Sequence, residues 1–86
     1  MKPDTIRDII MNSYDIRHLS KRCNYPQCKE KPTVGVEFFE FTLQRSIGIA
    51  NLYLCKDHIG TTARLMKTIR QQFPDSPIQS KQTTIA

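Results

Sequence analysis

Four side chains in this sequence have the types and the spacing of a metal site. Cys23 and Cys28 are separated by four residues in the segment "CNYPQC". After 26 intervening residues, Cys55 and His58 lie three positions apart in "YLCKDHIG". Zinc takes four soft or borderline ligands in a tetrahedron, and closely spaced ligand pairs are typical of its structural sites. The set includes every cysteine of the chain. The sequence therefore predicts one structural zinc ion per chain, bound by these four residues.

Each ligand pair needs an element that holds it in place. Pro26 stiffens the loop between Cys23 and Cys28, so that both sulfurs can face one point. A strand-like run precedes Cys55 and a helix-like run follows His58, which predicts that this pair lies in the first turn of a helix. Positions i and i+3 share one side of a helix, and the positive end of the helix dipole favours the thiolate form that a metal requires.

An interpretation without a metal is also open. Cys55 would then be a core residue of a strand, His58 would cap a helix, and the cysteine pair would be incidental. The other histidine, His18, could replace His58 as a ligand, but it falls on the polar side of the first predicted helix.

The elements around these residues follow from hydrophobic periodicity and turn residues. Near the N-terminus, Ile6, Ile9, Ile10 and Tyr14 recur at helical spacing behind a possible cap at Asp4 or Thr5. We expect this apolar stripe to be buried. The expected order is a helix over 4–19, a polar loop over 20–32, a strand over 33–41, a turn region over 42–48, a strand over 49–54, a helix from Lys56 or Asp57 to Phe73, and a flexible tail over 74–86.

This order of elements resembles the treble-clef zinc finger, in which a loop with two ligands is followed by a β-hairpin and by a helix that opens with two more. The resemblance covers residues 23–73. It implies that Cys23 and Cys28 are the knuckle ligands and that Cys55 and His58 are the ligands at the helix start.

The resemblance implies a small α+β domain stabilised by zinc. Residues 1–22 would form an N-terminal helix and basic linker, residues 23–73 the zinc module, and residues 74–86 the tail. The sequence departs from the usual knuckle, which has two residues between its cysteines and often a glycine after the second. Here four residues intervene and Lys29 follows. The treble clef serves many functions, so the fold alone does not decide what the protein does.

Length and composition limit the alternatives. Eighty-six residues make one small domain, of a size at which a metal or a partner often supplies stability. The chain has no apolar run long enough to span a membrane and no apolar stretch typical of a signal peptide. Three cysteines cannot form a complete disulfide framework. We therefore expect an intracellular, cytoplasmic protein.

The charge of the chain favours an anionic partner. The formal net charge is +5 and the pI is about 9.4. Basic residues concentrate around the predicted knuckle and on the last helix, where few acids intervene. The predicted nucleic-acid-binding residues are Lys21, Arg22, Lys29, Lys31, Arg64, Lys67 and Arg70. These observations favour a small nucleic-acid-binding regulator of transcription, with DNA preferred over RNA. A solvated basic face without a partner is the plain alternative.

A second functional hypothesis is a protein-interaction adaptor in which zinc only holds the domain together. One hairpin and one helix would leave the N-terminal stripe uncovered, which suggests a homodimer through that helix. No enzyme activity is expected, because four protein ligands leave no open position on the metal and no catalytic set is evident. No small-molecule substrate is expected either.

Overall fold

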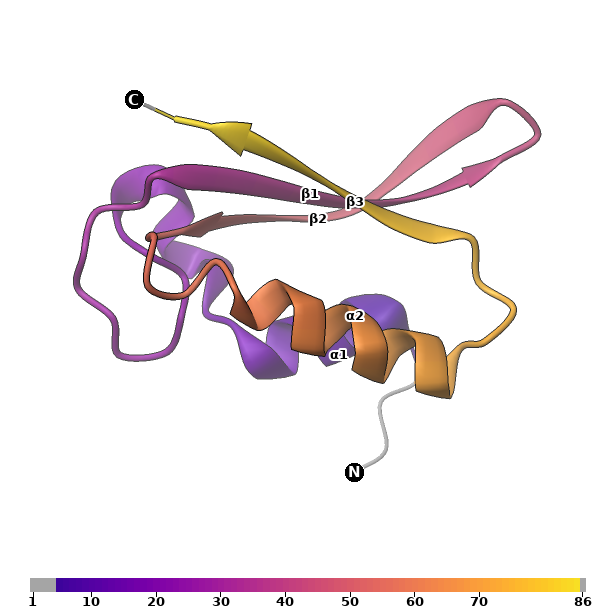
Figure 1. Ribbon diagram of the computed structural model, residues 1–86, viewed down its shortest axis with the longest axis horizontal. Helices are drawn as coiled ribbons and strands as arrows, with labels where there is room; N and C mark the ends of the chain where they lie inside the picture. The colour runs from indigo at the N-terminus through magenta and orange to yellow at the C-terminus, as the bar shows by residue number, and fades with distance from the viewer. Residues whose placement is uncertain (1–4, 86) are drawn as a thin grey trace.

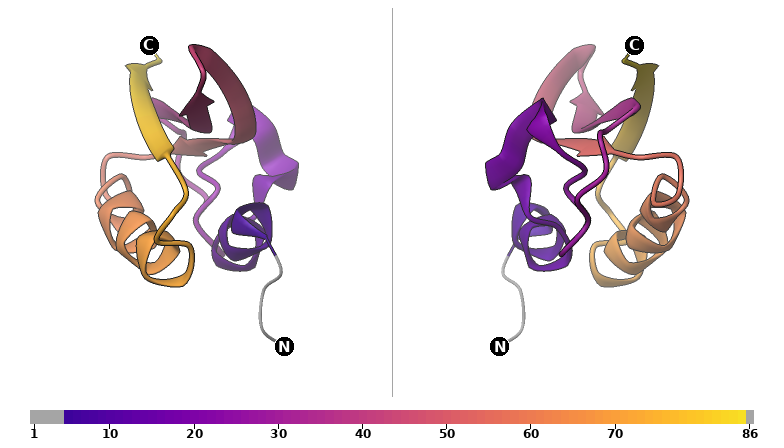
Figure 2. Two further views of the ribbon diagram at one scale, coloured as in Figure 1. Left: turned by 90° about the vertical axis from the view of Figure 1, so that its right-hand side faces the viewer. Right: turned by 90° about the vertical axis from the view of Figure 1, so that its left-hand side faces the viewer.

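A three-stranded antiparallel sheet with strand order β2-β1-β3 is covered on one face by two α-helices (Figures 1 and 2). The computed structural model describes residues 5–85. The elements are α1 (Ile6–Ser13), the 3₁₀ helix η1 (Ile16–Lys21), β1 (Val34–Thr42), β2 (Arg45–Leu54), α2 (Thr61–Gln72) and β3 (Ile78–Thr84). The protein is therefore a small α+β domain, as predicted. Within the described residues, neither helix combines the length and the apolar composition needed to cross a bilayer.

The β-hairpin is longer than predicted. β1 and β2 pair from Val34–Leu54 to Thr42–Arg45, so the connection is only Leu43 and Gln44 rather than residues 42–48. Both connecting residues have positive φ, 49° and 64°, as a tight type I′-like turn requires. A bulge follows Phe38 in the register. The hairpin consequently extends beyond the helices (Figure 1).

The first helix is shorter than predicted and belongs to the same core as the hairpin. Thr5 caps α1 in a capping box with Asp8, whereas Asp4 lies outside the described residues. α1 ends at Ser13 rather than at residue 19, because Tyr14 adopts an extended conformation and η1 follows. Asn12, Ser13 and Asp15 are residues that favour caps and turns over helix interiors.

The apolar stripe of α1 is buried within a single chain, which confirms its predicted burial. Its residues Ile6, Ile9, Ile10 and Tyr14 belong to the core between the sheet and the helices. Each fully buried isoleucine contributes about 1.5–3 kcal/mol. A homodimer through this helix was expected because the stripe would be uncovered. The stripe is covered, so that reason no longer applies. Residues 5–22 share one core with the hairpin and α2.

The prediction of a flexible C-terminal tail is wrong for most of its length. β3 pairs with β1 along its whole length, from Ile78–Glu40 to Thr84–Val34. Ile78 is its one buried side chain, and the other six are exposed. The strand is therefore held mainly by backbone hydrogen bonds, and its side chains carry no alternating hydrophobic pattern.

Candidate metal centre

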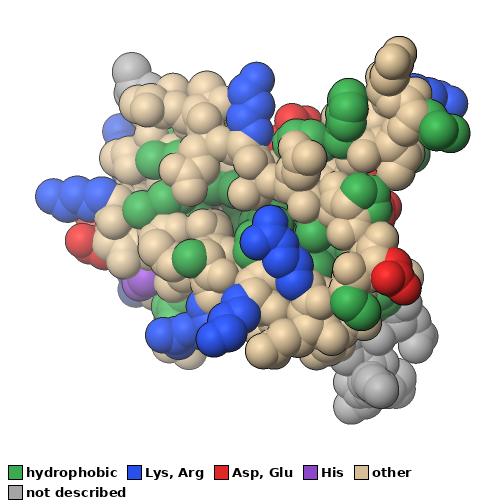
Figure 3. All heavy atoms as spheres, turned by 45° about the vertical axis from the view of Figure 1, so that its right-hand side comes forward, with side chains coloured by type: hydrophobic (Ala, Val, Ile, Leu, Met, Phe, Trp, Pro, Cys, Tyr) green, Lys and Arg blue, Asp and Glu red, His purple; other side chains and the backbone are tan. Residues whose placement is uncertain are grey.

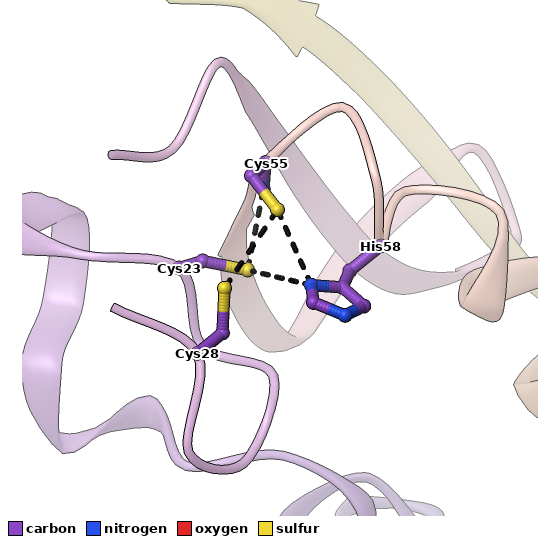
Figure 4. Close-up of side chains that lie close together, drawn as sticks. All are labelled: Cys23, Cys28, Cys55 and His58. Atoms are coloured by element: carbon purple, nitrogen blue, oxygen red, sulfur yellow. Dashed lines mark hydrogen bonds between the residues drawn. The ribbon is translucent and has the colours of Figure 1, made fainter. Parts of the chain in front are cut away.

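Cys23, Cys28, Cys55 and His58 converge on one point near the start of α2 (Figure 4). Their ligand atoms all lie within 4.8 Å of one another. Cys23 and Cys55 are buried, while Cys28 and His58 are half-buried. The prediction that these four side chains come together is confirmed.

The spacing of the atoms fits a tetrahedral metal. With metal–sulfur bonds of about 2.3 Å and a metal–nitrogen bond of about 2.0–2.1 Å, two sulfurs lie about 3.8 Å apart and a sulfur and a nitrogen about 3.6 Å. The Cys28 and Cys55 sulfurs are 3.8 Å apart, and Nδ1 of His58 lies 3.7 Å from Cys23 Sγ and 3.2 Å from Cys55 Sγ. A disulfide requires about 2.05 Å, and all three cysteines are free. Three soft sulfurs and an imidazole nitrogen form a donor set that suits zinc.

The knuckle is shaped by backbone hydrogen bonds rather than by a glycine. The Cys23 amide donates to the Glu30 carbonyl over 2.8 Å, and the Cys28 amide donates to the Tyr25 carbonyl over 3.0 Å. Gln27 adopts the left-handed conformation, with φ 67°, immediately before Cys28. This residue takes the backbone position for which glycine is the usual choice.

The second ligand pair lies in a turn that precedes α2, not in its first regular turn. The predicted helix start at Lys56 or Asp57 is therefore wrong, because α2 begins at Thr61. The amides of His58 and Ile59 both donate to the Cys55 carbonyl, over 3.1 and 3.0 Å, so the segment still coils helically. That local coil points both ligand atoms in one direction, as the i, i+3 spacing predicts.

Asn24 ties the knuckle to the outer edge of β2, and the sequence analysis missed it. Its side chain is fully buried and donates to the carbonyls of Leu19 and Arg22, over 3.0 and 3.1 Å. Its Oδ1 accepts from the Tyr53 amide over 2.9 Å, and its own amide donates to the Tyr53 carbonyl over 2.7 Å. The Asp15 amide donates to the Asn24 carbonyl over 2.8 Å. An asparagine directly after a ligand cysteine was the available signal.

Two tyrosines support the histidine ligand, and they were also missed. The ring of Tyr25 stacks on the His58 ring with centroids 3.9 Å apart and planes 3° apart. Tyr14 meets Tyr25 edge-on at 6.5 Å, and its hydroxyl lies 2.6 Å from Thr61 Oγ1. The stack fixes the plane of the imidazole, so that Nδ1 faces the sulfurs (Figure 4). Burial raises the pKa of Tyr14, and the hydrogen bond with Thr61 partly offsets it.

The electrostatics of the site favour protonated cysteine until a cation arrives. Burial raises the pKa of the Cys23 thiol to about 11, although the Cys55 amide, which donates to Cys23 Sγ over 3.3 Å, lowers it in part. A buried thiolate without a counterion is costly. A divalent cation among the sulfurs supplies that counterion, so metal binding is coupled to proton release.

His18 lies outside the cluster, as the preference for His58 predicts. Its Nε2 contacts Asp15 Oδ2 at 3.4 Å and the Arg22 guanidinium. Asp15 also accepts two hydrogen bonds from the side chain of Arg17, each 2.9 Å long. These bonds, the Arg17 amide and the nearby positive charges hold the pKa of Asp15 well below its usual range.

The predicted basic residues lie at the ends of the knuckle segment and along α2. Arg22 is half-buried beside His18, and its Nε is the one buried side-chain nitrogen or oxygen without a hydrogen-bond partner among residues 5–85. The other six are exposed: Lys21, Lys29, Lys31, Arg64, Lys67 and Arg70. Figure 3 shows lysine and arginine side chains over the lower and central part of the molecule, and others at its top and its left and right edges.

Comparisons of the chain with protein-family models, with curated proteins and with solved structures find no match.

Proposed function

We propose that this protein is a small treble-clef-like zinc finger that binds nucleic acid, with DNA preferred over RNA, and that regulates transcription. The zinc ion is structural, with one ion per chain. A knuckle with two ligands, a hairpin, and a turn with two ligands before α2 follow one another in the order of a treble clef. The donor set and its tetrahedral spacing support zinc as the metal.

The observation that carries the nucleic-acid proposal is the charge of α2. Its twelve residues include Arg64, Lys67 and Arg70 and no acid, and all three basic side chains are exposed. Neighbours at three-residue spacing share an edge of the helix, so Lys67 lies between the other two. Such a row, beginning one turn after the metal ligands, can contact successive phosphates.

The knuckle adds charge beside the start of this row. Arg64 and Tyr25 line the same hollow between α1 and α2, so the basic helix face continues toward the loop that also presents Lys29 and Lys31. Glu30 and Asp57 are the acids nearest in sequence to this surface. With four protein ligands the zinc has no open position, and we propose no enzymatic role.

Fluorescence anisotropy of the zinc-loaded protein with duplex and single-stranded oligonucleotides, from low to physiological salt, tests the proposal. We expect log–log salt dependence with a slope of about −0.9 per phosphate contact on duplex DNA. Combined Arg64→Ala and Lys67→Ala substitutions should flatten that slope by about two contacts, with an unchanged melting temperature.

Lys67→Ala and Lys81→Ala form a matched pair of variants. Both lysines are exposed, but Lys81 lies on β3 rather than on α2. The proposal requires that Lys67→Ala weaken binding more than Lys81→Ala, although both remove one charge. Equal effects of the two variants, or no binding to any oligonucleotide at low salt, would refute it and favour the adaptor hypothesis.

A further inference from the structure

The end of the β-hairpin carries an exposed apolar group. Leu43 at the turn is 94% exposed, and Phe41 and Ile47 are 48% and 51% exposed. Half of the exposed large hydrophobic residues in the described chain thus lie within seven consecutive positions. Figure 3 shows hydrophobic side chains on a projection at the upper right. Leu43 also occupies a positive-φ position that ordinarily takes asparagine or glycine, so turn chemistry does not account for its presence.

An apolar hollow lies at the base of the same hairpin. Ile6, Ile49 and Phe73 line it, and Glu40 and Gly48 complete the side that belongs to the sheet. Arg7 also reaches its rim, where its guanidinium donates to the Ile49 carbonyl over 2.9 Å. The molecule thus presents an apolar projection and an apolar recess on one continuous surface.

Gly48 has no role within its own chain that requires glycine. Its φ is not positive, and a Cβ built on it meets nothing within 4 Å. A glycine inside a strand weakens the strand and often marks a point where another backbone or ligand approaches closely. Gly48 pairs with Phe39, so its missing side chain belongs to the face that carries Phe41 and Ser46, and only the backbone of Gly48 borders the recess.

The register of the hairpin places complementary charges on the same face as the recess. Glu40 is opposite Ile47 and Thr42 is opposite Arg45, so these residues point to one face, and Phe41 and Ser46 point to the other. Glu40 lines the recess and accepts a hydrogen bond from Ser76 Oγ over 2.7 Å. The face toward the helices thus carries Arg45 near the tip and Glu40 at the base.

A two-fold axis makes this surface complementary to itself. Counted from the turn, Thr42–Arg45 is the first residue pair, Phe41–Ser46 the second, Glu40–Ile47 the third and Phe39–Gly48 the fourth. An axis through the second pair exchanges the first with the third and the turn with the fourth. With the helix-side faces of the two hairpins toward each other, this placement sets Thr42–Arg45 against the partner's Glu40–Ile47, and the turn against the partner's Phe39–Gly48 at the border of the recess. Arg45 then reaches the partner's Glu40 diagonally across the pair. Charge and shape are satisfied together, twice over by symmetry.

We propose that two copies of this chain associate through their hairpins, with the Leu43 tip of each seated in the recess at Gly48 of the other and Arg45 paired with the partner's Glu40. This surface includes the start of α1, at Ile6 and Arg7, and is distinct from the basic face of α2. A contact of a few residues on each side belongs to the small, weak class of interfaces. The second copy is the occupant because one chain supplies the projection, the recess and both charges.

A charge exchange between two variants tests the proposal in the zinc-loaded full-length protein. Sedimentation equilibrium from about 10 µM to about 1 mM covers the range expected of a small interface. The wild-type protein should form dimers in this range. Arg45→Glu alone and Glu40→Lys alone should each weaken the dimer by about a hundredfold or more, because each sets like charges against one another at both contacts.

An equimolar mixture of the two variants should restore a dimer. The Arg45→Glu chain still has Glu40 for the other chain's Arg45, and its new acid faces the new lysine. A wild-type protein that stays monomeric to about 1 mM would overturn the proposal, and so would a mixture that stays monomeric when the wild type dimerises. The mixture thus distinguishes contact between two copies of this chain from contact with a different macromolecule, because only the former is restored by exchanging the charges.

Removing the apolar tip provides a second test that leaves charge unchanged. Leu43→Asn replaces an exposed leucine by a residue that suits its positive φ, so we expect a folded monomer that does not dimerise. Met11→Ser is the matched control, because Met11 is an exposed hydrophobic residue on α1, away from the hairpin. Loss of the dimer in the Met11 variant but not in the Leu43 variant would overturn the proposed site.

Discussion

Removal of the Asn24 side chain should destabilise the protein strongly while leaving all four metal ligands in place. Asn24→Ala removes three hydrogen bonds, to the Leu19 and Arg22 carbonyls and from the Tyr53 amide. The backbone bonds of residue 24 to Tyr53 and Asp15 remain possible in the variant. The change therefore isolates the contribution of the side chain that connects η1, the knuckle and the edge of β2.

The expected magnitude follows from the number of bonds and their burial. Each buried hydrogen bond contributes about 1 kcal/mol net, so that three give a loss of about 3 kcal/mol in the free energy of unfolding. A loss of 1 kcal/mol lowers the melting temperature of a domain of this size by about 4–8 °C. We therefore expect Asn24→Ala to lower the melting temperature of the zinc-loaded protein by about 12–24 °C.

Thermal unfolding followed by circular dichroism measures this loss, and Asn51→Ala is the matched control. Asn51 is an asparagine on β2 itself. Its side chain is exposed, so its replacement should change the free energy of unfolding by less than about 0.5 kcal/mol. A melting temperature for Asn24→Ala within about 4 °C of that of Asn51→Ala would show that the buried network does not contribute as argued.

Three other predictions concern the metal and the hairpin turn. Structural zinc contributes about 10–16 kcal/mol of binding free energy, so chelation or Cys55→Ser should unfold the domain; a metal-free sample that keeps its circular dichroism spectrum and melting transition would contradict this. Zinc affinity should rise with pH up to about 8.5, the ordinary pKa of an exposed cysteine, because the unfolded metal-free chain must release its thiol protons to bind the ion. Gln44→Gly should raise the free energy of unfolding by about 1 kcal/mol, because Gln44 has φ 64°; no increase in the urea midpoint would show that the turn is unstrained.

The ligand set and the main elements could be predicted because their signals are local. Cysteine and histidine are chemically distinctive, and the pairs at Cys23 and Cys55 each lie within one loop or turn. The helical stripe of α1 and that of α2 are amphipathic, since each packs one side against the sheet. The end of α1 was misplaced because Tyr14 leaves the helix to reach Thr61, a contact 47 positions away in the chain.

β3 could not be predicted because it has almost no side-chain signal. Residues Gln79–Thr84 are exposed at the edge of a sheet whose second face carries no helix from residues 5–85, so neither of their faces needs to be apolar. Asn24 was missed for a related reason. Its importance depends on the Tyr53 backbone, 29 positions away, and the type of residue 53 has no influence on that contact.

The metal centre and the apolar hairpin tip lie at opposite ends of the molecule, whose longest extent is 35 Å (Figure 1). The knuckle and the start of α2 meet at one end, and the turn at Leu43 projects from the other. Self-association through the hairpins would therefore leave both basic faces open and point them away from the two-fold axis. Because neither Leu43 nor any residue of the recess belongs to the basic set, Leu43→Asn can abolish a dimer without removing a phosphate contact, and Lys67→Ala can do the reverse. The two proposals thus depend on separate surfaces of the same small fold, and each can fail without the other.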